Sequence, residues 1–192
     1  MKIKSFFYIA FSILISFNSL AQNKERKFKI HTLAFYNLEN LFDTINDVNK
    51  NDEASPIMEI KFNRGNIYKQ KVKNMARVIS EIGYDVTNRP PTIIGICEVE
   101  NRNVVEDLIA NEKLSKYNYG IVHYDSPDRR GIDVGLLYNK DIFKVINSNS
   151  HVLYINYNNT SDRSFTRDQL VVSGKLDGCL LYTSPSPRDV WV

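Results

Sequence analysis

The chain has 192 residues, of which 43% are hydrophobic and 24% are charged, and its formal net charge is +3. This composition is typical of one globular domain of moderate size, and the chain has no internal repeat and no long low-complexity segment. A charge so close to zero also argues against a strongly basic nucleic-acid scaffold, although it leaves a polyanionic partner open.

The N-terminal segment has the layout of a secretory signal peptide. Lys2 and Lys4 precede an apolar stretch at residues 6–17, and small residues follow in Ser19-Leu20-Ala21. The stretch is too short for a comfortable transmembrane span. We therefore expect residues 1–21 to be a signal peptide and the protein to be exported, to the periplasm or the extracellular space. An uncleaved membrane anchor is the alternative, and we expect membrane contact only through this segment.

The next residues predict a strand, a loop and a helix. The apolar segment 28–37 (FKIHTLAFYN) predicts a core strand that ends at Asn37. A polar, Asn/Asp-rich segment at residues 44–64 predicts a long surface loop. Apolar residues at helical spacing over residues 66–82 predict an amphipathic helix that stops at Gly83, with its lysines on a solvated face.

The remainder predicts one more helix and several strands. A buried strand at residues 92–97 precedes a short helix near residues 103–108. Strands alone follow, near residues 119–124, 134–138, 152–157 and 169–176. Helices that cover the faces of a sheet predict an α/β or α+β fold.

The C-terminal segment differs in character from the rest of the chain. Asp177-Gly178 is a typical hairpin turn, so a partner strand should follow it. Instead, the Ser/Pro-rich segment 179–192 resembles a translated sequencing adapter. We expect this segment to be non-native, the partner strand to be missing and the natural protein to be longer. A genuine flexible C-terminus is the alternative.

Two predicted strands end in side chains that can coordinate a cation. Asn37 ends the first, and Glu98 follows the apolar run of the second. Charged carboxylates are seldom buried unless they are paired or bind a metal. If the two strands are neighbours, an amide oxygen and a carboxylate meet, and such ligands suit Mg²⁺, Mn²⁺ or Ca²⁺ better than Zn²⁺. The alternative is a solvated strand end that leads into the helix near residue 101.

The segment 124–138 (YDSPDRRGIDVGLLY) places two arginines in a turn before a strand. A guanidinium from Arg129 or Arg130 can hold a phosphate with two parallel hydrogen bonds. A solvated arginine pair in a hairpin is the alternative.

Three stretches in this order resemble the endonuclease/exonuclease/phosphatase superfamily, especially its exported bacterial members. They are FYNLENLFD (35–43), IIGICEVEN (93–101) and DRRGIDVGLLYNK (128–140). The resemblance implies the DNase I-like fold, a four-layer α/β sandwich with two packed, mainly antiparallel sheets. We expect residues 22–178 to form the N-terminal part of this domain.

The resemblance also implies chemistry, because members hydrolyse phosphodiesters or phosphomonoesters with a divalent metal. Asn37 matches the asparagine that helps to position metal and nucleophile, and Glu98 matches the metal-binding acid. Arg130 lies where the family places a phosphate-contacting side chain, with Arg129 nearly as good a candidate. Arg167 matches a recurrent position to which no role is assigned. The expected metal is Mg²⁺, with Mn²⁺ or Ca²⁺ as substitutes.

The family's catalytic histidine and its further acids belong to motifs downstream of these stretches. We therefore expect this chain to be an inactive fragment of a metal-dependent phosphoesterase. The expected substrate is a phosphate ester from a nucleic acid, a nucleotide or a phospholipid head group, and no obligate protein partner is evident. The alternative is a non-catalytic exported binding domain on the same fold.

Overall fold

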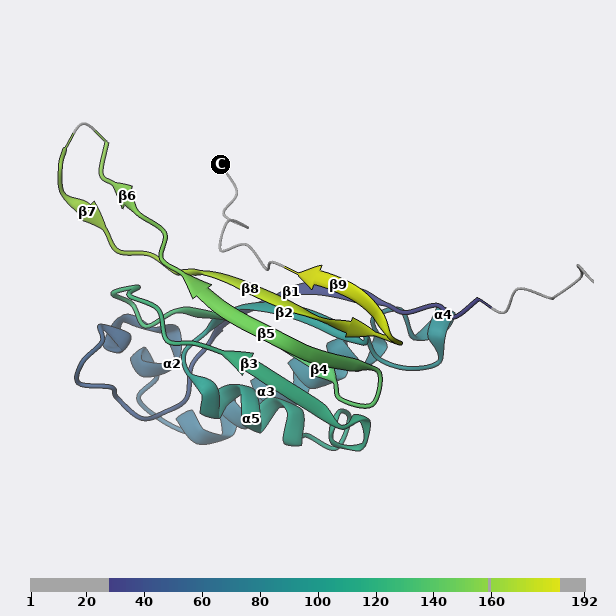
Figure 1. The fold of residues 1–192 in the computed structure, drawn as a ribbon. Helices are drawn as coiled ribbons and strands as arrows, with labels where there is room; N and C mark the ends of the chain where they lie inside the picture. The colour runs from purple at the N-terminus through teal and green to yellow at the C-terminus, as the bar shows by residue number, and fades with distance from the viewer. Residues whose placement is uncertain (1–27, 159, 184–192) are drawn as a thin grey trace, which may run out of the picture. The chain divides into compact units, whose positions relative to one another are not determined.

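The computed structural model describes residues 28–158 and 160–183 (Figure 1). The predicted signal peptide at residues 1–21 lies outside them. The chain divides into two compact units, Met1–Ile30 and His31–Val192. All the described helices and strands belong to the second unit, and the following description concerns that unit alone.

A mixed four-stranded sheet forms the centre of the unit. Its strand order is β1-β2-β4-β3, in which β1 and β2 are parallel and the other neighbours are antiparallel. The strands are β1 (Leu33–Leu41), β2 (Ile93–Val99), β3 (Tyr119–His123) and β4 (Asp133–Asn139). We call this sheet A.

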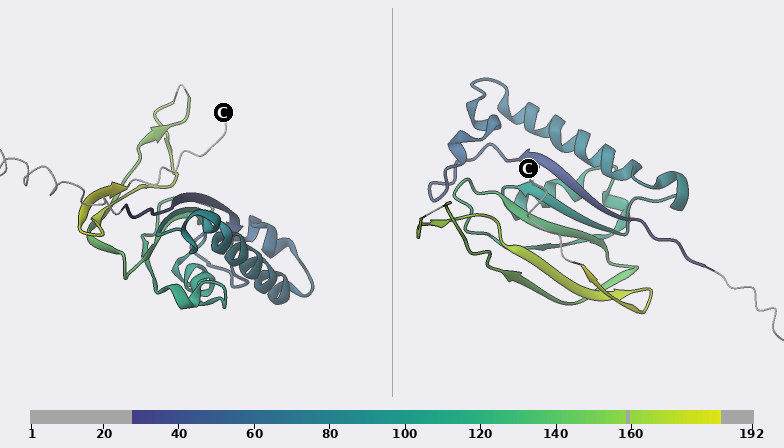
Figure 2. Two further views of the ribbon diagram at one scale, coloured as in Figure 1. Left: turned by 90° about the vertical axis from the view of Figure 1, so that its right-hand side faces the viewer. Right: turned by 90° about the horizontal axis from the view of Figure 1, so that it is seen from above.

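Helices α3 (Arg64–Glu81) and α5 (Arg102–Ala110) cover one face of sheet A (Figure 2). The buried residues of α3 follow the helical spacing that the sequence predicts, at Val72, Met75, Ala76 and Ile79. Asn101 is the N-cap of α5, because its side chain accepts a hydrogen bond from the backbone N–H of Val104. The shorter helical elements are η1 (Asp52–Ala54), α2 (Pro56–Glu59), α4 (Tyr84–Thr87) and η2 (Ser115–Tyr117).

A second, antiparallel sheet packs on the other face of sheet A. Phe143, Leu170 and Val172 of this sheet B form a buried cluster with Val134 and Leu136 of β4. Sheet B has the order β5-β8-β9, from β5 (Phe143–His151), β8 (Gln169–Leu176) and β9 (Cys179–Thr183). A two-stranded ribbon, β6 (Ile155–Asn156) and β7 (Arg163–Ser164), lies between β5 and β8 in the chain. The α/β class with two packed, mainly antiparallel sheets is confirmed.

Several element boundaries differ from the sequence-based predictions. The prediction that the first strand spans residues 28–37 is wrong, because β1 begins at Leu33 and continues through an irregular register to Leu41. The strand predicted at residues 152–157 shrinks to the two residues of β6. The longer β5, which precedes it, was not predicted, because its polar sequence KVINSNSH leaves most of its side chains exposed or half-buried. Pairing with β8 defines it instead.

The hairpin that joins β8 to β9 overturns one expectation. The missing partner strand is present, since residues 179–183 pair with β8 from Cys179 opposite Leu176 onward. Asp177 and Gly178 adopt φ angles of 47° and 89°, as a tight hairpin turn with both central residues left-handed requires. The non-native origin of residues 179–192 stays a prediction, and residues 184–192 lie outside the described part.

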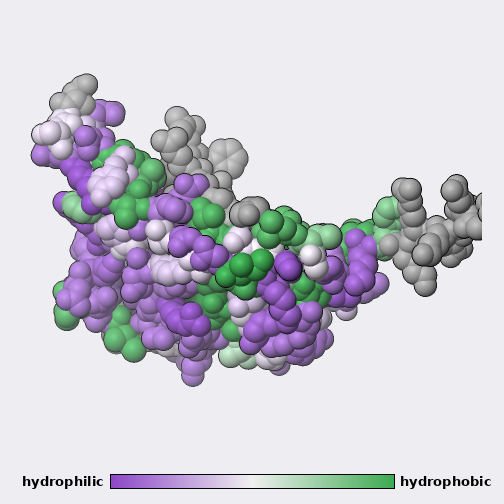
Figure 3. All heavy atoms as spheres, in the orientation of Figure 1, coloured by the Kyte–Doolittle hydropathy of each residue, from purple (hydrophilic) through white to green (hydrophobic). Residues whose placement is uncertain are grey.

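Some apolar side chains on the two sheets remain exposed. Phe35 of β1, Ile146 of β5 and Leu180 of β9 are each more than half exposed, and hydrophobic surface is visible in Figure 3 among otherwise polar atoms. Among the described residues, no helix is both long and apolar enough to cross a bilayer.

Replacing Gly174 with alanine should disrupt the packing of sheet B. An added Cβ would meet the ring of Phe143 and come within 2.5 Å of the Lys144 carbonyl oxygen, so backbone as well as side chain would have to move. Overpacking of this kind costs about 1–3 kcal/mol of unfolding free energy. Urea unfolding of Gly174→Ala measures the loss. Gly65→Ala is the control, because nothing lies within 4 Å of its Cβ position. Equal losses in the two variants would contradict the packing argument.

Candidate metal and phosphate site

The parallel pairing of β1 and β2 brings the two predicted ligands together. Asn37 pairs with Cys97 in the register of the two strands, so it lies beside the residue that precedes Glu98. Because parallel strands run in the same direction, their carboxyl ends meet at one edge of sheet A. The structure therefore places Asn37 and Glu98 at this edge, as the sequence predicts. We call Asn37, Glu98 and Arg130 the strand-end site.

Both strands leave their regular ladders at this edge. The register of β2 shifts around Glu98 in its pairing with β1 and with β4, and Glu98 has a φ of 59°. In β1 the shift lies between Asn37 and Leu41, where Glu39 and Asn40 have φ angles of 51° and 57°. Left-handed backbone is strained for residues other than glycine. Bulges in strands often occur next to functional sites, where they redirect side chains. The prediction that β1 ends at Asn37 misses this second bulge.

The bulge in β1 also holds the two candidate ligands. The Asn37 Oδ1 atom accepts a hydrogen bond of 2.7 Å from the backbone N–H of Glu39. The Glu98 Oε2 atom accepts one of 3.2 Å from the backbone N–H of Asn40. A carboxylate has about four acceptor positions and an amide oxygen has two, so both groups keep lone pairs for a cation.

Lys71 of α3 reaches this bulge from the helical layer. Its Nζ atom donates to the carbonyl oxygens of Glu39 and Asn40, at 2.5 and 2.9 Å. Burial lowers the pKa of Lys71, while the charges of Glu39 and Glu98 act in the opposite direction. The prediction that the lysines of this helix all lie on a solvated face is therefore wrong for Lys71, which stabilises the backbone beneath the site.

Within the strand-end site, Arg130 is held by a buried acid, Asp128. Its Nε and Nη2 atoms donate to the two carboxylate oxygens of Asp128, at 3.2 and 3.1 Å. Asp128 is 3% exposed, whereas Arg130 is 59% exposed and keeps further N–H groups toward solvent. The hydrogen bond to Asp128 raises the pKa of Arg130, desolvation opposes it, and the charges of Asp128 and Glu98 add to the increase. Arg130 also lines a cavity of about 270 Å³ together with Asn40.

The other two arginines have different surroundings. Arg129 lies over the ring of Phe165, 5.1 Å from its centroid, so the structure separates it from its neighbour Arg130. Arg167, to which the sequence assigned no role, is buried, and its Nη1 atom lies 4.0 Å from an Asp128 oxygen. Arg167 thus helps to neutralise the acid that orients Arg130.

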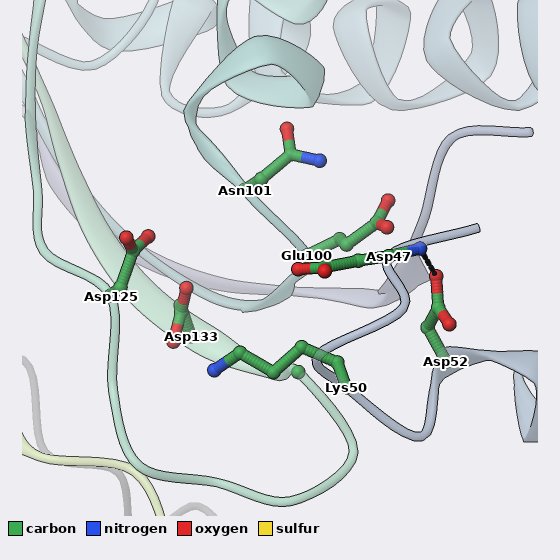
Figure 4. Close-up of a pocket in the computed structure, with 8 residues that line it drawn as sticks. Asp47, Lys50, Asp52, Glu100, Asn101, Asp125 and Asp133 are labelled. Atoms are coloured by element: carbon green, nitrogen blue, oxygen red, sulfur yellow. Dashed lines mark hydrogen bonds between the residues drawn. The ribbon is translucent and has the colours of Figure 1, made fainter. Parts of the chain in front are cut away.

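A second hollow at the same end of sheet A is strongly acidic (Figure 4). It has a volume of about 170 Å³, and no residue of the strand-end site lines it. Its lining residues are Asp47, Lys50, Asp52, Glu100, Asn101, Asp125, Gly131 and Asp133. We call it the acidic pocket. The sequence analysis did not find it, although the Asp-rich loop 44–64 and the second acid of GICEVEN were visible signals.

Glu100 shows how this pocket differs from a solvated strand end. Its side chain accepts a hydrogen bond of 2.6 Å from the backbone N–H of Asp43, and the residue is 9% exposed. Burial raises the pKa of Glu100 to about 7, opposed by this hydrogen bond and assisted by the negative charges of Asp43, Asp52 and Asp47.

The comparison with protein families supports the resemblance. A model described as "Endonuclease/Exonuclease/phosphatase family" matches residues 32–182. The chain belongs to this family. The match includes β1, β2 and β4, the strands that carry the three motifs. No curated protein matches the chain significantly.

Several solved structures are similar to this chain at low sequence identity. An endonuclease/exonuclease/phosphatase from Bacteroides vulgatus is 16% identical with a TM-score of 0.46, over 79% of this chain and 49% of that one. A mannosyl-6-phosphatase from Bacteroides thetaiotaomicron is 15% identical with a TM-score of 0.45, over the same shares. D. rerio TDP2 in complex with a single-strand DNA product is 17% identical with a TM-score of 0.38, over 59% and 38%. The chain spans about half the length of the first two.

Glu100→Gln should stabilise the protein more at pH 8 than at pH 5. The native pKa of about 7 lies above the ordinary value of 4.5, so between these values the unfolded chain releases a proton that the native state retains. The protonated Glu100 therefore makes its full contribution to the unfolding free energy below about pH 4.5. This contribution is lost as the pH rises through about 7. Glutamine cannot ionise and avoids the decrease.

Urea unfolding with EDTA at both pH values measures this effect. Glu81→Gln is the control, because Glu81 is an exposed partner of Arg77, and its effect should be small at both pH values. A gain for Glu100→Gln that is the same at pH 5 and pH 8 would show that the native pKa is not raised.

Proposed function

We propose that the intact protein is a divalent-metal-dependent phosphoesterase. The observation that carries the proposal is the convergence of Asn37 and Glu98 at one edge of sheet A, beside Arg130. Membership of a family of hydrolytic phosphoesterases supports the reaction class. The substrate would be a phosphate ester from a nucleic acid, a nucleotide or a phospholipid head group.

The residues at the strand-end site fit a hard cation such as Mg²⁺, or Mn²⁺ and Ca²⁺ in its place. Glu98 offers a carboxylate and Asn37 offers an amide oxygen, and Mg²⁺ binds through one or two such ligands and keeps water in its other positions. When bound, the metal would supply Lewis-acid stabilisation of the charge that develops on the phosphate.

The chain's own residues would bind and orient the ester. Arg130 would hold phosphate oxygens with the N–H groups that it does not direct at Asp128. Asp128 fixes the guanidinium plane, and Arg167 stabilises Asp128 from the protein side. Lys71 would hold the Glu39–Asn40 backbone, which in turn positions Glu98.

A base that activates water is a further requirement of this reaction. Within the described residues, His31 contacts Thr92 and Asp177, and His123 faces Asp133. His151 is an exposed residue of β5 in sheet B, and none of these observations gives a histidine a role at the strand-end site. We therefore propose that the chain by itself does not hydrolyse phosphate esters. Export of the protein is likewise a proposal, and it rests on residues 1–21 alone.

Glu98→Gln tests the proposed metal ligand. In the intact protein we expect turnover with Mg²⁺ to fall at least about 100-fold, because a charged ligand is lost while the side-chain shape is retained. The assay uses a panel of single-stranded DNA, nucleotides, a phosphorylated sugar and phospholipid head groups. Glu100→Gln is the matched control, because Glu100 lines the acidic pocket instead, and its effect should be mild. Glu98→Gln activity within about threefold of wild type would remove the assignment.

Arg130→Ala should weaken substrate binding and turnover, by about tenfold or more, because a guanidinium that contacts phosphate in the transition state is worth at least about 1.4 kcal/mol. The change should also lower stability, because Arg130 neutralises the buried Asp128. Arg130→Lys keeps the charge and separates the two effects: its stability should be near wild type while its activity stays low. Arg129→Ala is the control. If the loss follows Arg129 instead, the phosphate contact belongs to that residue.

A further inference from the structure

His123, Asp125 and Asp133 meet where β3 ends and β4 begins. His123 is the last residue of β3 and pairs with Gly135, and Asp133 is the first residue of β4. If the antiparallel register of His123 and Gly135 is extended by two residues, Asp125 falls opposite Asp133. One ligand atom from each of the three side chains lies within 4.8 Å of the other two.

This cluster is distinct from the strand-end site. Leu137 of β4 packs in the core under the helices, and side chains alternate along a strand, so Asp133 lies on the helical face of sheet A. By the same alternation Leu38 of β1 faces the helices and Asn37 faces the opposite side. Asp125 and Asp133 also line the acidic pocket, which no residue of the strand-end site lines (Figure 4).

The imidazole of His123 gives the strongest indication of a ligand. The side chains of His123 and Asp133 are each 3% exposed, and Nε2 lies 3.2 Å from Oδ2. That separation lies within ion-pair range, yet Nε2 has no hydrogen-bond partner. An N–H on Nε2 therefore does not point at the carboxylate. Asp133 uses its other oxygen to accept from the backbone N–H of Ser126, at 2.8 Å. A buried nitrogen that faces a carboxylate without sharing a proton is costly, and a cation bound by both atoms removes the cost.

We propose that His123, Asp125 and Asp133 bind a first-row transition-metal dication of the Zn²⁺ or Co²⁺ type. Such metals lie about 2.0–2.2 Å from nitrogen and oxygen ligands, so their ligands are at most about 4.4 Å apart. The separations in the cluster, within 4.8 Å, come close to this limit, and Asp125 is the exposed member of the three. An imidazole ligand favours these metals over Mg²⁺ and Ca²⁺.

The surroundings of the cluster suit a cation. Asp47 and Asp52 line the same pocket and add negative charge. The basic side chain in its lining, Lys50, is directed at the loop, where its Nζ atom donates to the Ser126 carbonyl oxygen at 3.0 Å. The pocket volume of about 170 Å³ leaves room for water to complete the coordination.

The bound metal would join the two ends of the loop at residues 124–132. This loop carries Asp128, Arg129 and Arg130, so the metal would restrict the segment that presents the phosphate-binding arginine. Binding to the folded state alone also raises the unfolding temperature.

A Co²⁺ titration of the EDTA-treated chain, followed by visible absorption, tests the proposal. We expect d–d bands that saturate at one equivalent, and Zn²⁺ should displace the Co²⁺ and raise the unfolding temperature. Asp125→Asn should lower the Co²⁺ affinity at least about tenfold, since a coordinating charge is lost. Asp125 is exposed, so this variant should fold even if His123→Ala does not. His151→Ala, which removes an exposed histidine, should bind Co²⁺ like wild type.

Two outcomes would overturn the site. One is unchanged Co²⁺ affinity in Asp125→Asn, and the other is loss of the bands in Glu98→Gln with retention in Asp125→Asn. Displacement of Co²⁺ by equimolar Mg²⁺ would overturn the metal class. Glu98→Gln should keep the Co²⁺ bands of this chain but lose hydrolysis in the intact protein. The Co²⁺ bands therefore test this metal site, and the hydrolysis assay separately tests the proposed function.

Discussion

The parallel pairing of β1 with β2 is the constraint on which the rest of the site depends. Parallel neighbours need a long crossover, and here the chain between them contains α3, which packs on the same sheet. This connection brings Asn37 and Glu98 to one edge although they are far apart in the sequence. The same helix supplies Lys71, which holds the strained backbone at residues 39 and 40. The helical layer thus contributes to the geometry of the site as well as to the core.

Charge is distributed unevenly between the strand-end site and the acidic pocket. The strand-end site contains the cation Arg130 and has Lys71 close by, and the charges of both interact with Glu98. The acidic pocket has Lys50 against several carboxylates, and desolvation there raises the pKa of Glu100. The loop at residues 124–132 connects the two, because it carries both Arg130 and Asp125, which lines the acidic pocket. A cation at one site would therefore affect the loop that serves the other.

Local patterns predicted those elements whose burial follows a simple period. The stripe of α3, the apolar run of β2 and the turn at Asp177-Gly178 all lie where the sequence places them. β5 was not predicted, because its polar residues give no alternation and its strand state depends on pairing with β8. β9 was rejected on its composition, although pairing with β8 makes it a strand as well. Pairing partners distant in sequence decided both.

The sequence by itself determined the family, the α/β class and the choice of Asn37 and Glu98 as candidate ligands, since these follow from short motifs and apolar runs. Only the tertiary structure decided that Lys71 reaches the site, that Glu100 is buried and that His123 faces Asp133. The reason is physical. Burial, desolvation and the approach of two polar side chains depend on which segments pack together, and no local period in the chain encodes that choice.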